Sequence, residues 1–286
     1  MQIKVIIPIY KKDLSKNETG SLKQCLTVLQ DYEFIFVTYN DLDISSYLRL
    51  ANATKATIRF EYFDREYFES INSYNQLLLS RKFYLRFQQE DYILIYQLDA
   101  FVFKNELAYW CEKNFDYIGA PWFTRKGDHE RGNTLYKVGN GGVSLRKISS
   151  FLERFDKQLP LSVFPFYVKN IRKKKFFSMC IKTLKIFFLL LFSDKTVEYY
   201  LLNLTDERIN EDIFWSEALA STSFALNVPD VITAARFCIE KSPSYLYHLI
   251  GEKLPFSCHA YEKYEYENFW QKYIFFRKFV DQTDVK

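Results

Sequence analysis

The sequence predicts an α/β protein with a mostly parallel central sheet, and two observations carry this prediction. Short apolar segments rich in β-branched residues recur through the first hundred residues. Between them lie segments whose apolar residues recur at helical spacing. Strands joined by helices in this way form doubly wound sheets, which bind ligands outside the carboxyl ends of their strands.

Each element follows from its local pattern. The predicted strands are Ile3–Pro8, Glu33–Thr38, Thr57–Tyr62 and Tyr92–Tyr96, all short and largely apolar. The predicted helices between them are Leu22–Leu29, Asp43–Leu50 and a long helix over Ser73–Phe87. The carboxyl ends of the strands single out Pro8–Lys11, Thr38–Asp41, Tyr62–Asp64 and Gln97–Phe101 as candidate ligand segments.

The second half is less regular. The expected elements are a helix over Glu106–Lys113, a strand over Tyr117–Trp122, a polar loop over Thr124–Asn133 and a helical tail over Phe256–Phe279. Residues 160–204 differ in composition and are expected to form a helical insertion within one domain of residues 1–286.

Composition bounds the class of protein. Of 286 residues, 48% are hydrophobic and 26% charged, which predicts a sizeable packed core. The net charge of +4 is mild, and no basic helix with base-reading residues occurs, so nucleic acid is not expected as a partner. The five cysteines are widely spaced, which favours a reducing compartment. No signal-peptide pattern and no apolar run of about 18 residues occurs, so a cytoplasmic protein is expected.

Asp99 follows directly on an apolar strand. A carboxylate there can reach a ligand at the edge of the sheet, and divalent metals bind carboxylate and phosphate oxygens together. An Asp that caps the following turn would have the same pattern, so spacing alone leaves both interpretations open.

Glu211 and Asp212 precede a periodic apolar segment, which predicts a helix N-terminus. Acids are favourable there as capping residues. A carboxylate in such a place could also serve as a general base.

His259 lies in an apolar stretch and is one of three histidines in the chain. Imidazole is a frequent metal ligand, although a buried histidine bonded to the backbone fits the same pattern. Gly139–Gly142 holds three of the eight glycines, which indicates close backbone approach and would suit a wall beside a sugar.

Taken in order, these segments form a recognisable set. The blocks are Ile7-Pro8-Ile9-Tyr10, Tyr96-Gln97-Leu98-Asp99-Ala100, Asp116-Tyr117-Ile118-Gly119-Ala120-Pro121-Trp122, Gly139-Asn140-Gly141-Gly142-Val143-Ser144-Leu145-Arg146, Asn210-Glu211-Asp212-Ile213-Phe214 and Phe256-Ser257-Cys258-His259-Ala260-Tyr261-Glu262-Lys263-Tyr264. The set resembles a bacterial family of uncharacterised proteins classed with GT-A-type glycosyltransferases. The resemblance covers Ile3 to Tyr273, less the insertion.

The resemblance implies a GT-A-like, Rossmann-like three-layer sandwich that binds a nucleotide-diphospho-sugar. Among such donors, a UDP-sugar is the one most expected. It implies transfer of the sugar to a glycan or lipid-linked glycan acceptor in bacterial surface polysaccharide synthesis. The donor-site residues that it implies, together with candidates from strand ends and the preceding helix, are Pro8, Tyr10, Thr38, Asp64, Asn75, Arg81, Asp99, Ala100, Gly141 and Gly142. For Arg81, a surface salt bridge is the competing interpretation.

The resemblance also implies roles in catalysis. Asp99 matches the first acid of an Asp-x-Asp metal motif, but Phe101 stands where the second acid would be. Asp99 and His259 are therefore the expected ligands of Mn²⁺ or Mg²⁺. Asp212 matches the base of inverting enzymes, and Glu211 would contact the acceptor or cap the helix. Trp122 and Phe123 are candidates to stack on an acceptor sugar, with core packing as the alternative.

Two other functions remain open. Phe101 favours a non-catalytic carbohydrate- or nucleotide-binding protein on the same scaffold, and a metal-dependent hydrolase using Asp99, Asp212 and His259 is a weaker option. Residues 169–192 run from a basic cluster into an apolar segment too short to span a bilayer. This pattern predicts peripheral contact with the inner face of the cytoplasmic membrane, or else a helix packed on the core.

Overall fold

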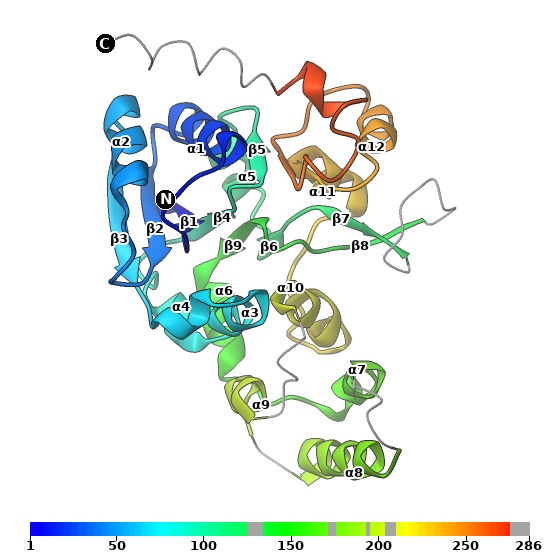
Figure 1. Ribbon diagram of the computed structural model, residues 1–286. Helices are drawn as coiled ribbons and strands as arrows, with labels where there is room; N and C mark the ends of the chain where they lie inside the picture. Colours follow the sequence, from blue (N-terminus) through cyan, green and yellow to red (C-terminus); the bar gives the residue numbers. More distant parts are fainter. Residues whose placement is uncertain (125–133, 171–175, 193–194, 204–209, 275–286) are drawn as a thin grey trace.

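The computed structural model of the chain describes residues 1–124, 134–170, 176–192, 195–203 and 210–274 (Figure 1). Most of the loop predicted over Thr124–Asn133 lies outside these residues, as does the end of the predicted helical tail.

A mixed, mostly parallel sheet forms the centre of the molecule. Its strand order is β3-β2-β1-β4-β9-β6. The strands are β1 (Ile3–Pro8), β2 (Glu33–Thr38), β3 (Ile58–Tyr62), β4 (Tyr92–Tyr96), β6 (Tyr117–Ile118) and β9 (Val143–Lys147). β1 to β4 are parallel, and β9 is antiparallel to both of its neighbours. The predicted α/β class with a mostly parallel sheet is confirmed.

Helices cover both faces of this sheet (Figure 1). On one face lie α1 (Lys16–Val28), α2 (Ser45–Thr54) and α5 (Leu107–Glu112), which pack on Val5 and Ile7. On the other lie α3 (Ile71–Leu78), α4 (Arg81–Leu85) and α6 (Ile148–Phe155), which pack on Ile6. Because β1 is buried on both faces, its sequence is apolar apart from Lys4, which pairs with Glu33.

The long helix predicted over Ser73–Phe87 is wrong. Two shorter helices, α3 and α4, meet at Leu79 and Ser80. The Ser80 side chain accepts a hydrogen bond from the backbone N–H of Phe83 and so caps a new helix. Apolar spacing continues across this break, which is why periodicity alone joins the two helices.

Two small sheets complete the second half. The first has the order β10-β11-β5, and the second is the hairpin β7-β8. Their strands are β5 (Ala100–Val102), β7 (Pro121–Phe123), β8 (Leu135–Val138), β10 (Cys238–Ile239) and β11 (Ser257–His259). α11 (Val231–Phe237) and α12 (Pro243–Leu249) flank them. The helical tail predicted from Phe256 is wrong, because this segment begins as β11 between β10 and β5 and continues largely as turns.

The predicted insertion is helical in its described residues. It holds a 3₁₀ turn (Leu161–Val163), α7 (Phe164–Asn170), α8 (Phe176–Phe192) and α9 (Val197–Asn203). α10 (Glu211–Ile213) follows and continues as one π-helical turn over Phe214–Ala218 and a 3₁₀ turn over Leu219–Ser221. Within the described residues, no helix has the length and apolar character needed to cross a membrane.

Candidate active site

The turn Gly139–Gly142 lies at the centre of the candidate site. It leads into β9, which neighbours β4 at the carboxyl edge of the sheet. Asn140 has a positive φ of 75°, and its Oδ1 accepts a hydrogen bond from the Gly142 N–H at 2.9 Å. Asn is one of the residues that adopt this left-handed conformation readily. The turn is held further by the Tyr117 hydroxyl, which donates to the Asn140 carbonyl at 3.0 Å.

Side chains from other segments touch the backbone at all three glycines of this turn, and at Gly141 and Gly142 these segments are distant in sequence. A Cβ atom on Gly142 would lie 2.1 Å from His259 Nε2. A Cβ atom on Gly141 would lie 2.1 Å from Glu211 Oε1. The predicted close approach at these glycines is therefore to the protein itself.

His259 lies beside Asp99. β11 pairs antiparallel with β5, with His259 opposite Ala100, and this register places the imidazole next to the carboxylate. His259 Nε2 is 3.1 Å from Asp99 Oδ1. His259 Nδ1 is 3.1 Å from Asn140 Nδ2 and 3.6 Å from Glu240 Oε1.

The charges around this pair favour an ionised carboxylate. Burial works to raise the pKa of Asp99, but His259 and Lys263 outweigh it, so the pKa lies below its usual range. Burial likewise works to lower the pKa of His259, but Asp99 and Glu240 outweigh it and raise the pKa to about 9. Lys263 Nζ is 3.8 Å from Asp99 Oδ2.

Sequence reasoning missed Glu240 and Lys263 as site residues. Lys263 stands within one of the motif blocks. Glu240 directly follows the strand β10, so the strand-end rule would have found it had that two-residue strand been recognised.

The donor atoms of Asp99 and His259 suit Mn²⁺ or Mg²⁺. The buried Nε2 of His259 has no hydrogen-bond partner among the described residues, although the Asp99 carboxylate is close. Once it has lost its proton, such a nitrogen beside a carboxylate fits a metal that takes its other ligands from phosphate and water. The described residues contain no group of three or more His, Cys, Asp or Glu placed to hold a metal. Phe101 is buried against Phe103 and Tyr261, so no second acid is available there.

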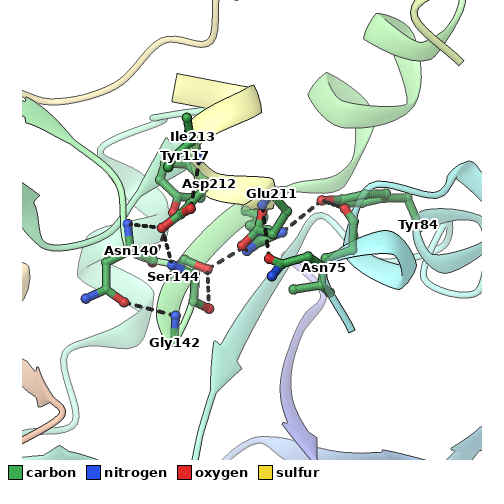
Figure 2. Close-up of polar contacts among 12 residues, drawn as sticks. Asn75, Tyr84, Tyr117, Asn140, Gly142, Ser144, Glu211, Asp212 and Ile213 are labelled. Carbon is green, nitrogen blue, oxygen red and sulfur yellow. Dashed lines mark hydrogen bonds and ion pairs between the residues drawn. The ribbon is translucent and has the colours of Figure 1, made fainter. Parts of the chain in front are cut away.

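Asp212 also binds the turn Gly139–Gly142 (Figure 2). Its Oδ2 accepts hydrogen bonds from the N–H groups of Asn140 and Gly141 at 3.1 and 3.2 Å. Its Oδ1 accepts from the Ile213 N–H at 2.8 Å. A carboxylate accepts about four hydrogen bonds, so one position remains. Burial raises the pKa of Asp212 despite these backbone bonds.

Glu211 has different partners from its neighbour (Figure 2). Its Oε1 lies 2.7 Å from Arg146 Nη2, and both side chains are buried. Burial raises the pKa of Glu211 to about 7, against the effect of Arg146. Arg146 also donates to the Tyr84 hydroxyl and to Ser144 Oγ. This position favours a structural role for Glu211 over contact with an acceptor.

Two predicted donor residues have other partners in this structure. Asn75 is buried, and its Oδ1 accepts the Glu211 N–H at 3.0 Å while its amide donates to the Ile71 carbonyl. Arg81 forms a surface ion pair with Asp156 and lies 3.6 Å from Glu198. Asn75 is thus engaged at the start of α10, whereas Arg81 is engaged at the surface.

A pocket of about 290 Å³ opens at the carboxyl ends of β2 and β3. Its lining residues are Tyr39, Asn40, Asp41, Tyr62, Phe63, Asp64 and Arg65. The Arg65 guanidinium lies 5.3 Å from the centre of the Tyr39 ring. These residues come from two of the segments that the strand-end rule singled out, and they include Asp64, which also pairs with Lys82 at 2.6 Å.

The other predicted donor residues differ in their access to a ligand. Pro8, Thr38, Ala100 and Gly142 are buried, whereas Tyr10 and part of Asp99 and Gly141 are accessible. Thr38 adjoins the pocket residue Tyr39, and its buried hydroxyl has no hydrogen-bond partner among the described residues. Ala100 has no exposed surface, so contact between its side chain and a donor is excluded in this structure.

The two predicted acceptor residues are packed against the protein. The Trp122 ring packs on Gly139, where a Cβ atom would lie 1.8 Å from Trp122 Cζ2. Phe123 is buried and its ring lies 6.2 Å from that of Tyr245. Phe123 therefore favours the core-packing alternative, while Trp122 is partly exposed.

Partial similarities to solved structures include the following two. Core-mannan synthase A from Aspergillus fumigatus, in its Mn/GDP form, is 9% identical, with a TM-score of 0.38 over 53% of this chain and 60% of that chain. A putative glucose-1-phosphate thymidylyltransferase from Bacillus anthracis, in complex with a sucrose, is 12% identical, with a TM-score of 0.33 over 64% of this chain and 83% of that chain. The chain thus spans less than two thirds of the synthase, and a likeness of this size assigns no activity.

No curated protein matches the sequence. Residues 57–259, more than half of the chain, match the family described as "Protein of unknown function (DUF5672)". The matched stretch contains Asp99, Asp212 and His259, and we conclude that the chain belongs to this family.

Proposed function

We propose that the chain transfers a sugar from a nucleotide-diphospho-sugar, a UDP-sugar first of all, to a hydroxyl group of a glycan. One observation carries the proposal: Asp99 with His259, and Asp212 from another segment, meet on the same turn, Gly139–Gly142. An acid beside a candidate metal ligand pair, at the carboxyl edge of a parallel sheet, suits transfer from a diphosphate donor.

The pocket at β2 and β3 is the candidate site for the nucleoside. Its aromatic and polar lining offers the Tyr39 ring for stacking and Asp64 and Asn40 for hydrogen bonds to a ribose or base. The diphosphate would then extend along the same edge of the sheet towards Asp99.

Asp99 and His259 would hold Mn²⁺ or Mg²⁺, which when bound offsets the negative charge of the leaving diphosphate. Lys263, close to Asp99, supplies a further positive charge at the same place. The protein's own contribution is to orient the imidazole, through Asn140 and through the space left by Gly142.

Asp212 acts as general base in this proposal. The acceptor oxygen forms a bond to the anomeric carbon, the bond from that carbon to the diphosphate oxygen breaks, and the acceptor proton passes to Asp212. Attack opposite the leaving group inverts the anomeric centre. The raised pKa of Asp212 and its one remaining acceptor position support this role.

The test combines a donor panel with one substitution. We expect transfer or slow hydrolysis with at least one UDP-, GDP- or CMP-sugar in the presence of Mn²⁺. Asp212→Asn should lower turnover by roughly 10²- to 10⁴-fold while nucleotide affinity is retained. Asp43→Asn, a surface carboxylate paired with Lys12, is the matched control and should keep full turnover.

Thermal unfolding of both variants checks that the turn still folds without the carboxylate. Retained transfer in a folded Asp212→Asn protein would remove Asp212 as the base. Loss of nucleotide affinity in that protein would instead assign Asp212 to the donor site.

A second function is favoured by Phe101, whose burial leaves the candidate metal site with two protein ligands. A carbohydrate- or nucleotide-binding protein without turnover would need no further metal ligands. Clear nucleotide binding without turnover of any donor in the panel would favour this alternative. A lipid-linked acceptor, if used, would require membrane contact at the inner face of the cytoplasmic membrane, for which residues 169–192 are the candidate.

A further inference from the structure

Helix α8 has a largely apolar sequence, but the described part of the chain covers only one side of it. Its 17 residues include a run from Ile186 to Phe192 without a polar side chain. Ile186 and Leu190, four residues apart, are buried against the core cluster that contains Val163 and Phe166. A helix that is apolar all round is normally buried all round.

The opposite side of α8 forms a continuous apolar face. The residues of this outer face are Ile181, Leu184, Phe188, Leu191 and Phe192, with exposed fractions from 45% to 76%. Successive members are three, four, three and one residues apart, so they lie on the same side of the helix. Single exposed apolar residues are ordinary, whereas a contiguous row marks a surface that binds something.

Figure 1 shows α8 at the end of the molecule away from the central sheet, with α7 between it and α10. None of the described elements covers the outer face, because its members keep about half or more of their surface. The rings of Phe188 and Phe192 stack on each other at 6.0 Å and leave Phe192 the most exposed of the five.

The exposed charges beside the outer face are mostly basic. No Asp or Glu occurs between Asp156 and Asp194. Lys185 lies on α8 itself and is exposed, and Lys169 at the end of α7 has a side chain 71% exposed, although its Nζ also lies 3.3 Å from the largely covered Glu217 carboxylate. An isologous contact with a second copy would bring two such basic surfaces together, whereas an anionic surface complements them.

We propose that the outer face of α8 lies in the interfacial region of an anionic lipid bilayer, with Lys169 and Lys185 towards the headgroups. At 17 residues α8 is about 26 Å long, and within the described chain no helix can cross a membrane, so it lies along the surface. The proposal stands independently of sugar transfer.

The test is sedimentation of the full-length protein with vesicles. Vesicles of phosphatidylcholine mixed with phosphatidylglycerol should bind at least about tenfold more tightly than vesicles of phosphatidylcholine alone, and high salt should weaken the binding. Equal partitioning into both kinds of vesicle, or no binding to either, would overturn the proposal.

Two matched variants locate the contact. Leu184→Glu/Leu191→Glu places two acids on the outer face and should lower binding to the anionic vesicles at least about tenfold. Leu85→Glu/Leu249→Glu makes the same exchange at two exposed leucines of α4 and α12 and should bind like the unmodified protein. Equal binding of both variants would show that α8 is not the contact.

Light scattering completes the experiment. A concentration-dependent dimer that Leu184→Glu/Leu191→Glu abolishes, without vesicle binding, would identify a second copy as the occupant and overturn the proposal. If that variant fails to fold, as judged by circular dichroism, Lys169→Gln/Lys185→Gln tests the same contact through its charges and should also weaken anionic binding.

Discussion

Arg146 and Glu211 form an ion pair with almost no contact with water. The guanidinium is held by the Tyr84 hydroxyl, Ser144 and the Glu211 carboxylate, so its charge is compensated within the core. The second Glu211 oxygen has no hydrogen-bond partner among the described residues. The pair therefore fixes the start of α10, and with it the neighbouring Asp212. The burial of two charged groups carries a desolvation cost.

Removal of one partner should be strongly destabilising. We expect Arg146→Met to lower the free energy of unfolding by about 3–5 kcal/mol, measured by urea denaturation, because Glu211 is left buried and unpaired. Burial already raises the pKa of Glu211 to about 7, and loss of Arg146 raises it further. At a pH between the ordinary and the raised pKa, the Glu211 carboxyl is protonated in the folded protein and ionised in the unfolded chain.

Stability of Arg146→Met should consequently fall as the pH rises from about 5 to about 8. Arg146→Met/Glu211→Gln removes the titrating group and should lose this added pH dependence. The opposite slope in the single variant, or the same slope in the double variant, would show that Glu211 is not its source.

At the scale of elements, α10 is too short to hold its own position and depends on its neighbours. Asn75 of α3 accepts the Glu211 N–H, and the turn before β9 binds Asp212. The π-helical turn that follows packs on α7, where Phe214 meets Phe166 at 6.5 Å. α3, the turn and the insertion together orient the candidate base.

Asn75→Ala should destabilise the fold by about 1–3 kcal/mol, because the buried Glu211 N–H loses its acceptor. Arg81→Ala is the control from the adjacent helix, and its exposed ion pair should be worth no more than about 1 kcal/mol. Both losses in the free energy of unfolding are to be measured by urea denaturation. A loss of nucleotide affinity in folded Arg81→Ala would restore the predicted donor contact that the structure does not show.

At the scale of the whole molecule, the proposed donor site joins residues from both halves of the chain. The pocket residues lie between Tyr39 and Arg65, whereas Lys263 and His259 come from the last described segment. A ligand that bridges these parts binds only the folded protein and so stabilises it.

A nucleoside diphosphate with Mn²⁺ at about a hundredfold excess over its Kd should raise the Tm by roughly 5–10 °C in a thermal shift assay. Chelation with EDTA should remove part of this shift, and Asp99→Asn should remove the same part. Arg65→Ala should lower the nucleotide-dependent part in the absence of metal. A shift unaffected by both substitutions would place the nucleotide elsewhere.

The sequence by itself determined the four parallel strands of the central sheet and the edge, at their carboxyl ends, where the candidate site lies. Runs such as Ile3–Pro8 and Tyr92–Tyr96 are short and almost continuously apolar, which is typical of parallel strands buried on both faces. The strand-end rule then reached Asp99 and the segments that line the pocket, because chain direction places the ends of parallel strands on one edge.

Only the tertiary structure decided what each side chain faces. Glu211 and Asp212 are adjacent in sequence, yet one pairs with Arg146 inside the core and the other binds the turn. β11 forms as a strand because β5 and β10 receive it, whereas its local sequence suggested a helix. The partners of Glu211 and Asp212 lie more than sixty residues away, and local pattern does not encode which partner a side chain meets.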